Sequence, residues 1–490
     1  MVTRLAIAAL ASALLAACSV GPDHVRPAVA VPATFSGSPA AGTAGAAPAP
    51  APITADVADF WVVFDDPQLT TLVQRALVAN HNLRIALSRY DEARALLRQS
   101  RLDVLPTVTA RGEAASTRAS ADQLPGLPRA ERDGDSYSAG LAASWELDLF
   151  GRVRRGIEAG RADATATADD LRATQVAVVA EVATAYLSLR GLQERLRVAE
   201  DNAGTQRDTL RLVEARFAAG QDSAFDSARA RAQVASTLAR VPALEAQVAA
   251  TIHRLAVLTG RTPDALLGEL SAVRALPAVP ATIDPGTPGT LLRRRPDIAA
   301  AEQRLHAATA RVGVATADLF PRFSLGALLG SQAIDSGDLF ARDSETRVVA
   351  LGIDWSFLDI GRVRARIAAR DAEAEGELAR YQQTVLLALE DTENALVRFD
   401  RARAEDRQLE EAALASARAA GLARLRFDAG ATGLLDVLDA ERTRLQAQDA
   451  FADSRTRSTT GAVAVYRALA GAWPQALPQR EVLGAAGSPR

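Results

Sequence analysis

Residues 137–152 read YSAGLAASWELDLFGR, and they join the two patterns that decide the fold. Up to Leu147, apolar residues alternate with small or polar ones, which is the period of a β-strand with two unlike faces. From Arg152 the chain has no proline before Pro242 and is rich in Ala, Leu, Arg and Glu, which favours a long helix. A helix from Arg152 to Phe217 would be about 100 Å long at 1.5 Å per residue. Such a length suits a tunnel wall or a coiled coil better than a compact enzyme.

These patterns occur twice in the chain. Residues 216–220 (RFAAG) match residues 426–430 (RFDAG), and Trp145 matches Trp355, in both cases at an offset of 210. Landmarks nearer the start of each copy match at an offset of 215, so the two copies differ in length between Pro106 and Trp145. The sequence therefore predicts an internal repeat whose helices keep their register while one loop varies.

Each copy contains two strand candidates with an alternating pattern. They are residues 107–114, 137–147, 323–329 and 349–357. A length of about ten residues and a tryptophan near one end favour strands of a membrane barrel. A soluble sheet with covered edges remains the alternative at this point.

The N-terminus has the pattern of a bacterial lipoprotein signal. Arg4 precedes an apolar stretch from Leu5 to Leu15 that is too short to span a bilayer. The tetrapeptide LAAC at 15–18 resembles a lipobox, which predicts that the sole cysteine, Cys18, becomes an acylated N-terminus. Ser19 stands where an Asp often retains such proteins at the inner membrane, so outer membrane lipid is expected to hold the anchor. A plain secretory signal is the alternative.

Composition excludes several classes of protein. The net charge is −3, so no basic field attracts nucleic acid. One cysteine and four scattered histidines give no spaced set of metal ligands, and no catalytic triad or phosphate-binding glycine loop is present. We therefore expect no enzyme, no catalytic residue, no metal and no cofactor.

Aromatic residues make up only 4% of the chain, so Ala, Leu and Val must form most of the packed core. No run of 18 apolar residues follows residue 17, and no transmembrane helix is expected.

Further segments together resemble one known family. They are CSVGPD at 18–23 with RP at 26–27, Trp61 with DPQL at 66–69, WELDLFGR at 145–152, LLRRRPDI at 291–298, and the two RF-containing segments at 216–220 and 426–430. These segments resemble outer membrane factors of the TolC/OprM type, specifically the NodT-type lipoproteins of tripartite efflux pumps. The resemblance covers essentially the whole mature chain, and RRRPDI is particularly specific. His24 stands where Tyr is common in the family.

The resemblance implies a homotrimer in which each chain gives four strands to one 12-stranded transmembrane β-barrel. The fold class is then mainly α with a transmembrane β-barrel, continued by a long α-helical periplasmic tunnel and built from two tandem structural repeats. Barrel closure explains how four strands can exist, because an open sheet would leave unpaired edges in lipid. The implied partners are a periplasmic adaptor and an inner-membrane RND pump.

The expected division of the chain follows from the repeat and the N-terminal signal. Residues 27–55 contain little besides Ala, Pro, Gly, Ser and Thr, which predicts an extended tether rather than a core. The segments are a signal peptide (1–17), a lipid-anchored tether (18–60), a first efflux repeat (61–275), a linker (276–289), a second efflux repeat (290–475) and a C-terminal tail (476–490).

The two RF-containing segments lie at the ends of the longest predicted helices. Gly220 and Gly430 suit a left-handed helix C-cap, and Ser223 can cap the next helix. Capping alone accounts for the glycines but not for the repeated Arg and Phe. By the resemblance these tips meet the adaptor, and the predicted docking residues are Arg216, Phe217, Gly220, Arg426, Phe427 and Gly430.

By the same resemblance, a constriction of the inner helix follows the second tip. Asp436, Asp439 and Arg442 are spaced by three, so they lie near one helix stripe. In a trimer the carboxylates would form a narrow ring that favours cations, with Arg442 bridging Asp439 and holding the periplasmic aperture shut. Thr432 stands where some relatives carry Arg, so part of their locking network is missing. An ordinary exposed charged face is the alternative.

Two other groups of residues are interpreted as structural. Arg293–Arg295 are expected to form the solvated start of a helix with Pro296 in its first turn. His253 and His306 are expected on a surface or tunnel wall rather than as ligands.

The sequence is compatible with three functions. The leading one is a passive exit duct for small molecules in an RND-type tripartite efflux pump of the bacterial outer membrane. The second is a TolC-like duct for type I protein secretion, and the third is a structural periplasmic coiled-coil lipoprotein without a pore. The alternating strands count against the third, and the substrate range is not written in this chain.

Overall fold

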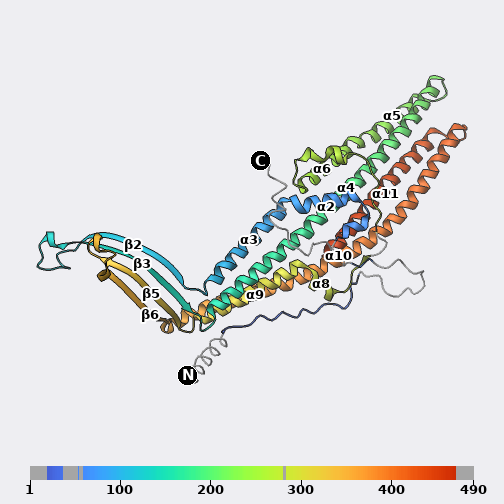
Figure 1. Cartoon of the computed structure of the whole chain (residues 1–490). Coiled ribbons are helices and arrows are strands. Elements are labelled where there is room, and N and C mark those ends of the chain that lie inside the picture. The colour runs from blue at the N-terminus through green and yellow to red at the C-terminus, as the bar shows by residue number, and fades with distance from the viewer. Residues whose placement is uncertain (1–18, 37–52, 55–58, 280–282, 471–490) are drawn as a thin grey trace. The chain divides into compact units, whose positions relative to one another are not determined.

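The computed structural model describes residues 19–36, 53–54, 59–279 and 283–470, coloured along the chain in Figure 1. These residues form two compact units, and each is assembled from separate segments of the chain. The first unit takes residues 19–28, 90–167 and 300–382. The remaining described residues form the second unit.

The first unit contains an antiparallel sheet with the order β2-β3-β5-β6 (Figure 1). Its strands are β2 (Thr107–Arg118), β3 (Asp133–Leu147), β5 (Arg322–Ala333) and β6 (Glu345–Asp354). All four predicted strands are present. The connection between β2 and β3 is longer than the one between β5 and β6, which agrees with the length difference predicted between the copies.

The register of the sheet places the predicted apolar residues on one face. Leu141 of β3 lies opposite Leu329 of β5, and Leu325 of β5 lies opposite Leu351 of β6. Leu141, Leu329 and Leu351 are 53%, 60% and 62% exposed. An exposed row of leucines on a sheet is the arrangement that strands set in lipid require.

In each copy a tryptophan hydrogen-bonds to the turn that joins the preceding helix to the strand pair. The indole N–H of Trp145 donates to the carbonyl oxygen of Val104 at 2.8 Å, and that of Trp355 donates to Leu319 at 3.1 Å. The two hydrogen bonds are equivalent in the two copies. Trp355 was expected inside the last strand, but β6 ends at Asp354, because the chain leaves the sheet there and enters a 3₁₀ turn that leads into the next helix.

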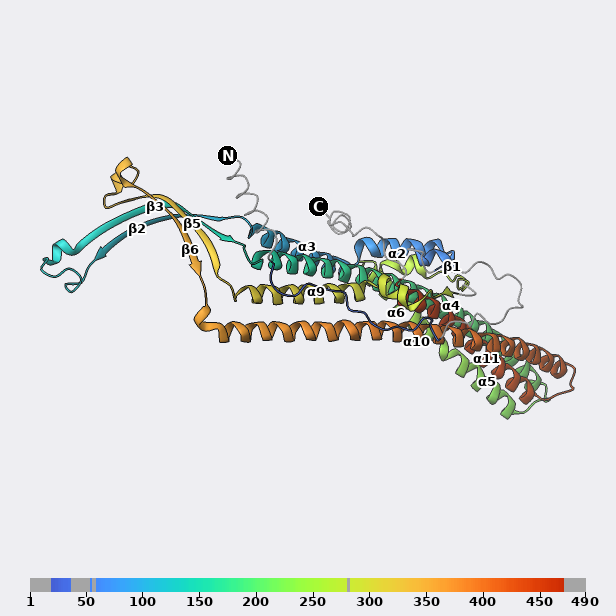
Figure 2. The same ribbon diagram turned by 90° about the horizontal axis from the view of Figure 1, so that it is seen from below.

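Four helices that contribute to this unit run along one another in Figure 2. They are α3 (His81–Leu102), α4 (Arg152–Ala218), α9 (Pro296–Ala317) and α10 (Ile360–Asp428). Alanines form much of the buried surface, for example Ala162 of α4 and Ala307 of α9, as the low aromatic content predicts. The long helix predicted from Arg152 to Phe217 ends one residue later than expected.

The second unit contains the other α-helices and strands, together with the 3₁₀ helices η1 (Phe60–Phe64) and η3 (Pro263–Leu266). These α-helices and strands are β1 (Ile53–Thr54), α2 (Pro67–Ala79), α5 (Ala224–Leu238), α6 (Arg240–Leu258), α7 (Leu267–Leu270), β4 (Ile283–Asp284), α8 (Pro288–Arg294) and α11 (Leu434–Ala468), with parts of α3, α4, α9 and α10. Val179, Ala183 and Tyr186 are fully buried, as their spacing of three and four residues predicts. The Phe60 ring stacks on Tyr466 with centroids 5.0 Å apart. Among the described helices, none has a stretch both long and apolar enough to cross a bilayer.

The segment expected to be a free tether is partly packed. Phe35 is only 4% exposed, and the backbone N–H and hydroxyl of Ser36 both donate to the Glu393 carboxylate, at 2.8 and 2.7 Å. Composition alone did not predict this packing, because a single anchoring side chain in an Ala/Pro-rich stretch gives no periodic signal. Cys18, the signal peptide and the tail 476–490 lie outside the described residues.

Candidate functional site

The two predicted tips have the same backbone geometry. Gly220 and Gly430 adopt φ values of +75° and +71°, the left-handed conformation that favours glycine. At each tip the glycine N–H donates to the carbonyl of the preceding phenylalanine at 2.9 Å, which ends the helix. After the first tip, Ser223 and Asp226 form a reciprocal capping box at the start of α5. The capping predicted from sequence is therefore present.

The aromatic residues of the two tips lie in different surroundings. Phe427 is 3% exposed and packs with Val213, Leu434, Val437 and Leu438. The Arg216 guanidinium lies over the Phe427 ring, 4.8 Å from its centroid. Phe217 is 46% exposed. Repetition of the motif therefore did not predict its packing, since Phe427 fills a core while Phe217 remains at the surface.

The three predicted aperture residues lie on one exposed stripe of α11. Arg442 donates to the Asp439 carboxylate within the chain, and the Thr432 hydroxyl donates to Asp436. The Arg442 and Asp439 side chains are 57% and 60% exposed, so in the single chain their ion pair adds little stability. The predicted ion pair between Asp439 and Arg442 forms within the chain, and Asp436 accepts a hydrogen bond from the Thr432 hydroxyl.

Glu441, beside this stripe, was missed by sequence reasoning. It is 2% exposed, accepts a hydrogen bond from the Thr209 hydroxyl at 3.0 Å, and has one buried oxygen without a partner. Burial raises the pKa of this carboxyl above its ordinary value. The available signal was its position, four residues after Val437 and four before Leu445, on the buried side of α11.

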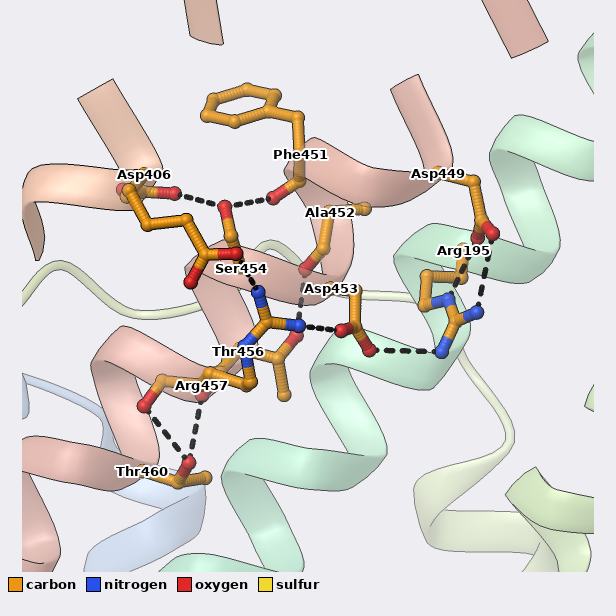
Figure 3. A network of polar contacts seen from close by, with 11 residues as sticks. Arg195, Asp406, Asp449, Phe451, Ala452, Asp453, Ser454, Thr456, Arg457 and Thr460 are labelled. Atoms are coloured by element: carbon orange, nitrogen blue, oxygen red, sulfur yellow. Dashed lines mark hydrogen bonds and ion pairs between the residues drawn. The ribbon is translucent and has the colours of Figure 1, made fainter. Parts of the chain in front are cut away.

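A network of charged residues joins α4, α10 and α11 (Figure 3). Arg195 of α4 donates to Asp449 at 2.7 Å and to Asp453 at 3.0 Å, both on α11. Arg457 pairs with the same Asp453 and with Glu405 of α10, the latter at 2.7 Å. Charged residues far apart in the sequence therefore fix α11 against its two long neighbours. No local motif predicts this network.

The interpretation of Arg293–Arg295 is corrected by the structure. These residues end α8 rather than begin a helix, and the Arg295 side chain is only 13% exposed. Its guanidinium pairs with Asp297 at 2.7 Å and with Asp391 at 3.3 Å, and donates to the Ala468 carbonyl at 2.9 Å. Arg295 is therefore largely covered by its partners, while Pro296 is the first residue of the next helix, α9, as the sequence predicts.

Comparison with known proteins decides the family. The family model described as outer membrane efflux protein matches residues 72–261 and 287–471. The chain belongs to the outer membrane efflux protein family. Its two matched segments agree with the two tandem repeats. The family consists of outer membrane channels rather than enzymes, and the protein is located in the bacterial outer membrane.

Individual relatives cover nearly the full length of this efflux protein. Outer membrane protein OprJ of Pseudomonas aeruginosa is 34% identical over 96% of both chains. Nodulation protein T of Rhizobium leguminosarum bv. trifolii is 30% identical over 88% of this chain and 90% of its own. The solved structure of the outer membrane channel OprN is 40% identical, with a TM-score of 0.85 over 93% of this chain and all of the other. The fold is therefore that of TolC-like channels, mainly helical with a β-barrel component.

Proposed function

We propose that this protein is the outer membrane exit duct of a tripartite RND-type efflux pump. It passes small molecules passively, while a periplasmic adaptor connects it to an inner-membrane pump. The observation that carries the proposal is a four-stranded sheet with an exposed apolar face in a chain that also contains helices of 67 and 69 residues. Relatives named as toluene and solvent efflux components, each at least 30% identical over 94% or more of this chain, favour small molecules over secreted proteins.

Three chains are proposed to complete the barrel. Four strands leave β2 and β6 as sheet edges, and unpaired edges are not stable in lipid. A homotrimer supplies 12 strands and removes all edges. The same symmetry would bring three copies of Asp436 and Asp439 together at the periplasmic aperture, which would favour cations.

Conductance in planar bilayers tests the duct and its aperture. Arg442→Ala should raise conductance several-fold, because it removes the partner of Asp439, and Asp436→Ala with Asp439→Ala should reduce cation selectivity. Arg211→Ala is the matched control, since Arg211 forms a similar exposed pair with Asp208 on α4. Unchanged conductance and selectivity in the aperture variants would contradict the aperture assignment but not the proposal that the protein is a duct. A purified protein that forms no channel, with or without Arg442, would support the non-pore lipoprotein instead.

The tips are proposed to dock the adaptor, with Phe217 and Arg426 at the contact and Phe427 supporting them from inside. Phe217→Ala should reduce co-purification with a co-expressed periplasmic adaptor and leave the melting temperature unchanged, because Phe217 is exposed. Phe427→Ala should instead cost about 3 kcal/mol of stability, because it empties a core position. Equal effects of both variants on adaptor binding and melting would contradict these roles.

Acylation of Cys18 is proposed to anchor the N-terminus in outer membrane lipid. Radiolabelled palmitate should enter the wild-type protein and not Cys18→Ser, because the chain has no other cysteine. Intact mass spectrometry should give a chain that begins at residue 18 and carries acyl groups. An unmodified chain with another first residue would refute the proposal.

A further inference from the structure

The chain that follows Cys18 is bound to the first unit in one register. We call residues 19–27 the N-terminal strap. The Val20 N–H donates to the Phe150 carbonyl at 3.2 Å, and the buried Arg155 guanidinium pairs with Asp23 at 2.5 Å. Gly21 has a φ of +92°, and a Cβ there would lie 2.4 Å from the Gly313 Cα. The strap can pack this closely only because residue 21 is glycine.

Two histidines meet at the centre of this contact. The His24 ring of the strap stacks on His306 of α9, with centroids 4.5 Å apart and planes inclined by 13°. The His306 Nε2 lies 2.8 Å from a Glu158 oxygen of α4, and Glu158 also pairs with Arg155 at 2.8 Å. The His24 Nε2 is buried and has no hydrogen-bond partner. The Glu158 carboxylate therefore contacts His306 directly, whereas the described residues place no hydrogen-bond partner at the His24 Nε2.

Several charged groups surround the stacked rings, and two of the carboxylates pair with arginines. Asp23 forms an ion pair with Arg155, and Glu302 of α9 pairs with Arg26 of the strap at 3.1 Å. The charged groups that face His24 from the packed elements are Asp23 and Arg26 on the strap, Arg155 and Glu158 on α4, Glu302 on α9, and Asp371 and Glu375 of α10, which line the same groove. Burial, and then the charge of His306, lower the pKa of His24, while Glu158 acts in the opposite direction.

We propose that the strap is a proton-sensitive clasp, held on α4 and α9 while His24 is neutral and loosened when His24 takes a proton. The free strap binds a proton more readily than the docked one, because docking buries His24 against a second imidazole. Docking is therefore fully favourable above the ordinary pKa of 6.5 and weakens as the pH falls below it. The clasp sets how firmly the segment next to Cys18 is attached to the first unit.

Spin-label mobility on the full-length protein in detergent tests the clasp. Val25→Cys places a nitroxide on the strap at a position that is 78% exposed. The wild-type protein, treated with the same label, measures any signal from a label on Cys18. The mobile fraction should rise several-fold between pH 7.5 and 5.5. In a His24→Tyr background, an aromatic ring remains but no imidazole titrates, so the strap should stay immobile at both pH values.

Two further variants separate the clasp from a general effect of acid. His306→Gln removes the second imidazole and should reduce the transition, while His253→Gln, a histidine of α6 outside the strap contact, should leave it intact. An equal rise in mobility in the His24→Tyr background would overturn the proposal. The proposal would also be overturned if the strap of the Val25→Cys protein, with both histidines present, stayed immobile down to pH 5.5.

Discussion

Gly191 decides how closely α4 and α11 can approach. A Cβ at this position would lie 1.9 Å from the Thr456 Oγ1 and 2.7 Å from the Thr456 Cβ, so no larger residue fits without movement of a helix. Arg195, one turn further along α4, pairs with Asp449 and Asp453 on α11 (Figure 3). The close approach and the ion pairs lie on the same side of α4. Together they fix the helix that carries the proposed aperture.

Gly191→Ala should therefore destabilise the protein by about 1–3 kcal/mol, because the added methyl group displaces Thr456. Gly204→Ala on the same helix is the matched control, since no atom lies within 4 Å of its added Cβ. That control should gain roughly 0.5–1 kcal/mol from helix propensity. Thermal or denaturant unfolding of the two variants measures both effects. Equal shifts in the same direction would show that the α4–α11 contact does not depend on Gly191.

At the scale of elements, the sequence predicted most of what the structure contains because the signals are local. The absence of proline from Arg152 onward predicts the long helix, and the tip glycine Gly220 marks its end to within one residue. Alternation in residues 137–147 places β3. The end of β6 was misplaced because it depends on where the chain turns into a 3₁₀ segment. No feature of the local sequence marks that turn.

Only those features of the candidate sites that depend on residues close in sequence could be predicted. Tip glycines and the capping Ser223 follow from the sequence, as does the spacing of Asp439 and Arg442. Whether a side chain is buried depends on helices that are distant in sequence. This is why the repeated motifs around Phe217 and Phe427 have opposite environments, and why a buried Glu441 was not expected within a charged stretch.

At the scale of the whole molecule, the two repeats give one sheet whose order β2-β3-β5-β6 leaves an edge in each copy. Both edges carry exposed apolar residues on the same face: Val108 of β2 lies in one cross-strand row with Val349 of β6, through Ala143 and Ala327. Val108 and Val349 are 60% and 74% exposed. A second chain can therefore extend the sheet at either edge without changing its apolar face.

Cross-linking between edges distinguishes a closed ring from open extension. Val108→Cys on β2 is combined in turn with Val349→Cys, Leu351→Cys or Ile353→Cys on β6. The double variant whose two cysteines lie opposite each other across the chain–chain contact should form covalent dimers and trimers. Nothing larger should form, because the third copy closes the ring. The trimer should have about three times the 51.5 kDa mass of the chain, less the signal peptides and plus lipid. Single-cysteine variants control for reaction with Cys18. A ladder that continues beyond three chains would indicate an open sheet, and a channel-forming monomer would exclude the shared barrel.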